Sequence, residues 1–189
     1  MTAIVGPEME MWTDGSVVPD TFSGWAFTLP SLPGATTFKG QWFAKRRESD
    51  VTLTELRGIR AALQYLTSSS PRVGATEVNS ARRIDIHTDC QDALDEINLE
   101  RGDGYELHRN AFGWKCYVED VPAHHLDVVR GIIASVETLL SQYGIRVILS
   151  WQRRRTTAGG IVADNWASQG AVTAMRLAGT TRYEVNGTF

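Results

Sequence analysis

The first third of the chain shows the alternation of polar and large side chains that is typical of β-strands. Residues 8–13 alternate at the two-residue period of a half-buried strand, and the tripeptide Asp14-Gly15-Ser16 that follows predicts a turn. Two segments rich in aromatic residues and threonine, 23–28 and 35–44, come next and are separated by prolines and a glycine. The pattern therefore predicts a meander of three antiparallel strands.

From Leu53 onwards the spacing of apolar residues changes to that of helices. Leu56, Ile59 and Leu63 recur at steps of three and four residues, which places them on one face of a helix that ends near Ser68. The remaining predicted elements are a strand at 83–88, a helix at 91–99, a helix at 126–143, a strand at 145–151 and a helix at 161–177. This order predicts a mixed sheet with helices packed against its faces.

Length and composition favour one folded unit. The chain has 189 residues, of which 42% are hydrophobic, enough for one core and short for two. We therefore expect a single domain over residues 1–189, with its core at about 8–178 and a loosely held tail at 179–189. The net charge is -3, so the chain has no global basic field and any contact with nucleic acid must be local.

The cysteine content and the hydropathy pattern bear on the compartment. Cys90 and Cys116 cannot form a disulfide framework or a four-cysteine zinc site, so we expect a reducing, cytoplasmic environment. No stretch reaches the roughly 18 apolar residues that a membrane span requires, and the N-terminus lacks the pattern of a secretion signal. Membrane insertion and secretion are therefore not expected.

Four acidic residues occupy comparable places in the predicted fold. Asp14 and Asp89 follow the first and fourth strands, so parallel pairing of these strands would bring both carboxylates to one edge of the sheet. Glu55 and Asp164 lie on the apolar faces of two helices, where an acid is costly unless it is paired or binds a metal. Oxygen ligands alone favour magnesium or manganese, and two such ions can cleave a phosphodiester. The pattern predicts one metal site.

Three of these acids also have an ordinary structural explanation. Asp89 could cap the helix that starts at Gln91, and Thr52 with Glu55 matches a capping box. Asp14 could be a turn residue beside a glycine. Asp164 has the weakest alternative, because it lies mid-helix on the apolar side. Four coincidences in this order are much less plausible than one shared site.

Short motifs surround the acids and follow one another in a specific order. They are Thr13-Asp14-Gly15-Ser16, Gly24-Trp25-Ala26, Thr54-Glu55-Leu56 with Ala61-Ala62-Leu63, Thr88-Asp89-Cys90-Gln91, Gly113-Trp114-Lys115 with Leu126-Asp127, and Ala163-Asp164 with Ala167. In this order the motifs resemble those of type 1 ribonuclease H over about residues 8–171.

The resemblance implies a ribonuclease H-like α/β fold, with a five-stranded mixed sheet of three antiparallel strands then two parallel strands and helices on both faces. It also implies a metal-dependent endonuclease that cleaves the RNA strand of RNA/DNA hybrids with two Mg²⁺ ions, for which Mn²⁺ can substitute. Asp14, Glu55, Asp89 and Asp164 match the catalytic, metal-binding carboxylates of the family. Family members of this size usually act alone, so a monomer is expected.

Two places depart from the family pattern. Arg154 stands ten residues before Asp164, where the family often has a histidine that helps product release, so slower catalysis is expected. Val51 and Thr52 stand where family members place asparagines that contact the hybrid. Altered recognition of the RNA 2'-hydroxyl groups is therefore expected.

Several other residues are candidate contacts to the substrate. The loop 153–155 either binds phosphate through its guanidinium groups or is simply solvated. His108 and Arg109, with Trp114 and Lys115, either grip the substrate as a handle or form a surface that nearby acids make less basic. The full set of candidates is Gly15, Ser16, Thr52, Gln91, Trp114, Lys115, Arg153, Arg154 and Arg155.

A few residues near these motifs have both a functional and a structural interpretation. Gly159 and Gly160 either let the arginine loop close over substrate or turn the chain into the last helix. Trp12 either packs beneath the acids or fills the core. His124 and His125 show no zinc spacing with the cysteines and are predicted to be surface residues.

Three functions are compatible with the sequence. The first is an endoribonuclease specific for hybrids, and the second is a nuclease of the same fold that acts on another nucleic acid. The third is a catalytically inactive module that binds nucleic acid or protein. The complete acid set favours the first two, because an inactive domain has no reason to retain four acids that are costly to bury.

Overall fold

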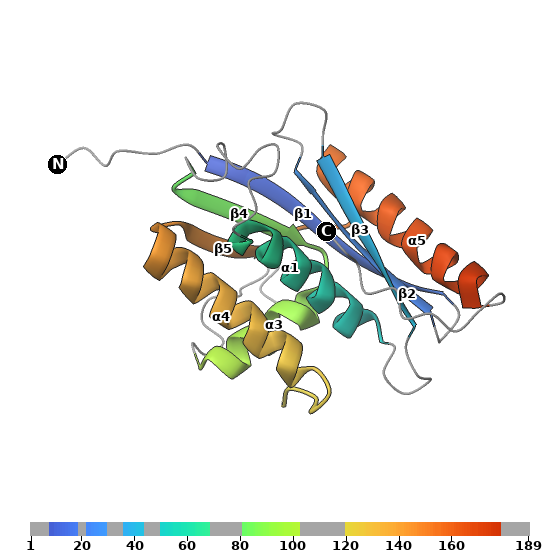
Figure 1. The fold of residues 1–189 in the computed structure, drawn as a ribbon, viewed down its shortest axis with the longest axis horizontal. Helices are drawn as coiled ribbons and strands as arrows, with labels where there is room; N and C mark the ends of the chain where they lie inside the picture. The colour runs from blue at the N-terminus through green and yellow to red at the C-terminus, as the bar shows by residue number, and fades with distance from the viewer. Residues whose placement is uncertain are drawn as a thin grey trace.

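The described part of the chain forms one mixed sheet with helices on both faces (Figure 1). The computed structural model describes residues 8–18, 22–29, 36–43, 50–68, 81–102 and 120–178, with 36–43 and 177–178 described as backbone alone. The strands are β1 (Glu8–Val18), β2 (Phe22–Leu29), β3 (Thr36–Phe43), β4 (Arg83–Thr88) and β5 (Arg146–Trp151). The helices are α1 (Val51–Thr67), α3 (Gln91–Arg101), α4 (Leu126–Tyr143) and α5 (Ala158–Ala178).

The strand order places β1 at the centre of the sheet. The order is β3-β2-β1-β4-β5, with β1 antiparallel to β2 and β2 antiparallel to β3. β4 runs parallel to β1 and to β5. The predicted mixed α/β architecture and the parallel pairing of the strands before Asp14 and Asp89 are confirmed. The β1–β4 pairing ends at Trp12 and His87, so Asp14 on β1 and Asp89 after β4 follow it on neighbouring strands.

Two glycines let a helix lie directly against each face of the sheet. A Cβ atom on Gly15 would stand 2.6 Å from the backbone nitrogen of Glu55 on α1. A Cβ atom on Gly24 would stand 2.3 Å from the backbone nitrogen of Ala171 on α5. Figure 1 shows α1 and α5 on opposite sides of the strands. Acids from both helices can therefore approach Asp14 on the central strand.

The core between the sheet and α1 follows the predicted apolar pattern. Leu56, Ile59 and Leu63 are fully buried, and so is Met11 on β1. Ile86 on β4 is 1% exposed. Burial of an aliphatic side chain of this size stabilises the fold by about 1.5–3 kcal/mol. This packing fixes α1 on the sheet and with it the position of Glu55.

Two element boundaries differ from the sequence prediction. β1 does not end in a turn at Asp14 but continues to Val18, because the strand stays paired with β2 as far as Phe22. α5 begins at Ala158, so Gly159 and Gly160 belong to the helix and not to a closing loop. A Cβ atom at position 159 would stand 2.3 Å from the Trp12 ring, so this glycine lets α5 pack on that ring.

Some predictions fall on other parts of the chain. The proposed handle with His108, Arg109, Trp114 and Lys115, and the tail at 179–189, lie outside the described residues. Among the helices that are described, none combines the length and the apolar content needed to cross a membrane.

Candidate functional site

Three of the four predicted carboxylates converge where β4 ends and its pairing with β1 stops. Asp14 lies on β1, Asp89 directly follows β4, and Glu55 projects from the N-terminal part of α1. One carboxylate oxygen from each residue lies within 4.8 Å of the other two. The parallel register, in which Trp12 pairs with His87, is what brings the strand ends together. Residues far apart in sequence thus form one acidic cluster.

The ordinary explanations for these acids are wrong. Asp50 is the N-cap of α1, and its carboxylate accepts a hydrogen bond from the Leu53 amide at 2.5 Å, so Glu55 is not part of a capping box. Cys90 is at the N-cap position of α3, so Asp89 is not the cap of that helix. Asp14 lies within a continuous strand and not in a turn.

The cluster is buried and incompletely satisfied. Asp14 is 4% exposed and Glu55 is 2% exposed. The Thr88 hydroxyl donates a hydrogen bond to Glu55 Oε2 at 3.3 Å. Asp14 Oδ2 is buried and has no hydrogen-bond partner among the described residues. An unpaired buried carboxylate oxygen is unfavourable, so this atom lacks the cation or donor that would satisfy it.

Burial and mutual repulsion oppose ionisation of the cluster. Burial, and then the charge of Asp89, raise the pKa of Asp14 to about 7. Burial and the charges of Asp14 and Asp89 raise the pKa of Glu55 well above its usual value. Burial also raises the pKa of Asp89, although Arg154 acts in the opposite direction. A bound divalent cation would reverse this balance by neutralising the ionised carboxylates.

Asp164 is held differently from the other three acids. It is 2% exposed on α5, and the Arg154 guanidinium donates to its Oδ1 through Nη2 at 2.6 Å. Arg155 donates to Oδ2 through Nε at 2.8 Å. Burial would raise the pKa of Asp164, but these hydrogen bonds hold the pKa below its usual value. Asp164 therefore lies outside the three-carboxylate group and is paired with arginines.

Arg154 links Asp164 to the cluster. Its Nε lies 3.6 Å from Asp89 Oδ2 as well as 3.2 Å from Asp164 Oδ1. Arg155, at φ 55°, has a left-handed backbone conformation that is unusual for a residue with a side chain. The loop 153–155 lines a small depression together with residues that include Trp12, Asp14 and Asp89. Trp12 is 8% exposed, so it lies beside the site and is also largely buried.

The other substrate candidates that the structure describes have protein partners or limited exposure. Gly15 is buried beneath α1, and the Ser16 and Ser168 hydroxyl groups lie 3.5 Å apart. The Gln91 amide donates a hydrogen bond to Asp95 at 3.1 Å, along α3. Thr52 is half-buried in the first turn of α1. A contact with substrate at these positions stays a prediction.

The prediction that both neighbouring histidines lie on the surface is wrong for His125. His125 is 1% exposed and forms hydrogen bonds at 2.8 Å to Glu96 and to Asp50, whereas the side chain of His124 is 42% exposed. The burial arises because the start of α4 packs against α1 and α3, which carry these acids. The partners are 29 and 75 residues away in sequence, so no local pattern could have indicated them.

Solved structures share this fold. The foamy viral protease-reverse transcriptase in complex with dsDNA matches at 18% identity and TM-score 0.54, over 92% of this chain and 99% of that chain. The same viral protein in complex with an RNA/DNA hybrid matches at 17% identity and TM-score 0.53, over 92% of this chain, which spans 21% of the viral chain. LC11-RNase H1 in complex with an RNA/DNA hybrid matches at 10% identity and TM-score 0.53, over 88% of this chain and 99% of that chain. No protein-family profile and no curated protein matches the sequence. The chain therefore has a ribonuclease H-like fold.

Proposed function

We propose that this ribonuclease H-like chain is a metal-dependent endonuclease that cleaves the RNA strand of RNA/DNA hybrids. The observation that carries the proposal is the convergence of Asp14, Glu55 and Asp89, with one buried Asp14 oxygen left without a partner. Such a group is unfavourable in a domain that binds no cation. The catalytically inactive alternative gives no reason for it.

The donor set fits magnesium, with manganese as a substitute. All three groups offer carboxylate oxygens, which hard cations prefer, and the cluster contains no imidazole or thiolate that would favour zinc. When bound, Mg²⁺ ions supply an activated water and neutralise the charge that develops on the phosphodiester oxygens. We propose two ions, as in the two-metal reaction.

The residues around the cluster would position cation and substrate. Asp14, Glu55 and Asp89 would hold the first cation, and the close packing of α1 on Gly15 keeps Glu55 at its distance from Asp14. Asp164 would be available to a second cation only without its hydrogen bonds to Arg154 and Arg155. The released guanidinium groups, whose side chains are 62% and 60% exposed, can then bind the substrate phosphates.

Two observations favour a hybrid as the substrate. The motifs around the four acids resemble those of type 1 ribonuclease H. Two of the similar solved structures hold an RNA/DNA hybrid, whereas one holds dsDNA. A nuclease acting on another nucleic acid is the second candidate, and the dsDNA complex is the observation that favours it.

The proposal is tested with labelled nucleic acids. We expect the protein to cleave the RNA strand of a hybrid in the presence of Mg²⁺ or Mn²⁺, and cleavage to stop when EDTA removes the cation. Duplex RNA, duplex DNA and single strands of the same sequence are incubated in parallel. Gel analysis of products labelled at either end distinguishes endonucleolytic from terminal cleavage.

Asp89→Asn is the control, because it keeps the side-chain size and removes a charged ligand. Cleavage of the hybrid should be lost in this variant. Cleavage that survives the substitution contradicts the assignment of the site. Cleavage of duplex DNA in preference to the hybrid supports the second candidate, and no metal-dependent cleavage of any nucleic acid contradicts both.

Removal of Arg154 should tighten the binding of Mg²⁺. In Arg154→Ala the guanidinium no longer neutralises Asp164 and Asp89, so a cation meets less competition. Because the arginine is more than half exposed, we expect only about a twofold to fivefold gain in affinity, as for a solvent-screened ion pair. Calorimetric titration without nucleic acid measures the change.

Arg153→Ala is the matched variant, since Arg153 forms no ion pair among the described residues. It should bind Mg²⁺ as the unmodified protein does. Equal affinities in the two arginine variants would show that the Arg154 ion pairs do not compete with the cation.

A further inference from the structure

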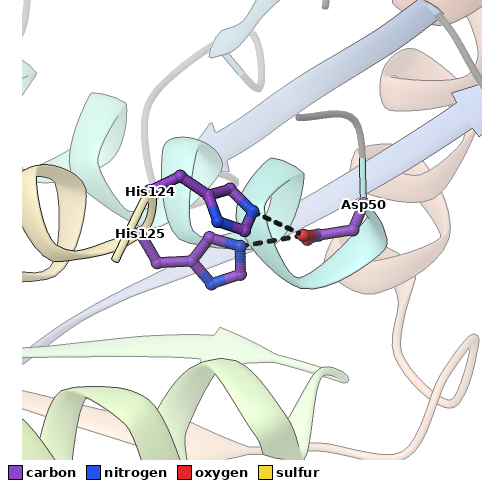
Figure 2. Close-up of side chains that lie close together, drawn as sticks. All are labelled: Asp50, His124 and His125. Atoms are coloured by element: carbon purple, nitrogen blue, oxygen red, sulfur yellow. Dashed lines mark hydrogen bonds and ion pairs between the residues drawn. The ribbon is translucent and has the colours of Figure 1, made fainter. Parts of the chain in front are cut away.

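A second group of potential metal ligands lies apart from the three carboxylates, at the N-terminal ends of α1 and α4. Asp50 precedes α1, and His124 and His125 precede α4. Figure 2 shows both imidazole rings directed at the Asp50 carboxylate. His124 Nε2 lies 3.3 Å from Asp50 Oδ2, and His125 Nε2 lies 2.8 Å from the same oxygen. One ligand atom from each residue lies within 4.8 Å of the other two.

A hydrogen bond to Glu96 fixes the orientation of the His125 ring. Its Nδ1 is hydrogen-bonded to Glu96 Oε2 at 2.8 Å, and both residues are almost fully buried. A histidine that binds a metal through one ring nitrogen nearly always has the other nitrogen hydrogen-bonded to a carboxylate or carbonyl group. Glu96 therefore orients the His125 ring, as such a carboxylate orients a histidine that binds a metal. The Nε2 atom, on the other side of the ring, faces Asp50.

Asp50 is fixed in the same way. Its Oδ1 accepts the Leu53 amide at the start of α1, which leaves Oδ2 directed at the two histidines. The side chains of Asp50 and His124 are 44% and 42% exposed, so a cation and a water ligand can reach the group from solvent. The group is therefore held rigidly at His125 and is open to solvent at Asp50 and His124.

We propose that Asp50, His124 and His125 bind Zn²⁺, at a site distinct from the carboxylate cluster. Two imidazoles and one carboxylate form a donor set that suits zinc, whereas magnesium prefers oxygen ligands alone. Tetrahedral zinc with ligands at about 2.0–2.2 Å needs donor atoms about 3.3–3.6 Å apart. His124 Nε2 lies 3.3 Å and His125 Nε2 lies 2.8 Å from Asp50 Oδ2, so the second of these distances must lengthen when the ion binds.

The proposed ion would join two helices that carry different parts of the protein. Asp50 caps α1, which bears Glu55, and the two histidines lead into α4. Without zinc, a protonated His125 can bridge Asp50 and Glu96, so the same contacts can form as ion pairs. The test must therefore measure the metal itself.

The experiment titrates Zn²⁺ into the EDTA-treated, dialysed 189-residue protein in millimolar Mg²⁺, which is added to fill the proposed carboxylate site. We expect one equivalent of zinc to bind, and a zinc concentration about a hundred times the dissociation constant to raise Tm by about 5–10 °C. The same titration in Asp14→Asn should give the same result, so the outcome does not depend on nuclease activity.

Three variants assign the ligands. His124→Gln removes an exposed imidazole without disturbing the core, and it should weaken zinc binding at least tenfold. Glu96→Gln should weaken binding by about tenfold to a hundredfold through the orientation of His125. His87→Gln, at a histidine outside the group, should bind as the unmodified protein does.

Two results would overturn the proposal. One is the absence of stoichiometric zinc binding in the unmodified protein, which leaves the group as a proton-bridged contact between helices. The other is undiminished affinity in His124→Gln, which places the metal elsewhere.

Discussion

Asp14→Asn is expected to make the metal-free protein more stable at pH 8 while it abolishes cleavage of the hybrid. In the metal-free fold Asp14 is buried beside Asp89, which raises its pKa to about 7 from the ordinary value of 3.8. The folded state therefore binds a proton between these values that the unfolded state has released. The contribution of Asp14 to stability therefore falls as pH rises from about 4 to about 7 and stays low above that range.

Asparagine removes this unfavourable charge. A pKa difference of this size corresponds to at most about 4 kcal/mol, and relaxation of the site reduces it, so we expect a gain of about 1–3 kcal/mol at pH 8. The fall in stability between pH 4 and 7 should also become shallower. Urea unfolding in EDTA at several pH values measures both effects.

The same substitution should lower the rate of hybrid cleavage by a hundredfold or more. A metal site supplies several kcal/mol of transition-state stabilisation, and Asp14 is proposed as one of its ligands. If Asp14→Asn both stabilises the protein and abolishes cleavage, Asp14 is needed for catalysis and not for folding.

Asp164→Asn is the matched control, since Asp164 is equally buried but has a pKa below its usual value. A group of this kind contributes stability above its unfolded pKa, and this contribution is lost as pH falls through the folded value. Asp164→Asn should therefore destabilise the metal-free protein at pH 8. If both substitutions change stability in the same direction, the electrostatic description of the site is wrong.

Gly24→Ala should cause a large loss of stability. A methyl group at this position would stand 2.3 Å from the Ala171 nitrogen and 2.4 Å from the Ala167 oxygen, so it meets helix backbone that cannot rotate away. Displacement of α5 from the sheet should destabilise the fold by about 3 kcal/mol or more, the upper range for overpacking. Thermal unfolding should show Tm lowered by about 6–12 °C.

Gly131→Ala, within α4, is the comparison. There the new methyl group meets the flexible end of Arg60, 3.1 Å away, and alanine favours the helix. Stability should change little or increase slightly. A loss in Gly131→Ala as large as in Gly24→Ala would show that close packing of α5 on β2 is not the cause.

The acidic cluster was predictable because its members follow general rules of chain geometry. Alternation indicated β1 and β4, and parallel strands bring their carboxyl ends to one edge, which places Asp14 near Asp89. The helical spacing of Leu56 and Ile59 put Glu55 on the face of α1 that packs against the sheet. The signals that indicated these elements are local in sequence. The structure adds the strand pairing, the close approach of three acids and the separate pairing of Asp164 with arginines.

Other features depended on contacts that no local pattern contains. The end of β1 is set by its pairing with β2, so the predicted end at Asp14 was wrong. The start of α1 is set by the Asp50 cap, which the apolar spacing from Leu53 onwards does not indicate. The arginine loop was expected to face phosphate or solvent, whereas Arg154 and Arg155 bind Asp164. His125 is buried against Glu96 on α3 and Asp50 at the N-cap of α1.

The close approach of α1 to β1 bears on how the chain can change over evolution. At Gly15 two backbones touch, so the gap between Glu55 and Asp14 is set by main-chain atoms and not by the size of interior side chains. Mutations that enlarge or shrink the interior should alter thermal tolerance before they alter the spacing of the acids. Distant lineages can thus replace most of their apolar residues and still inherit the same constellation of charges.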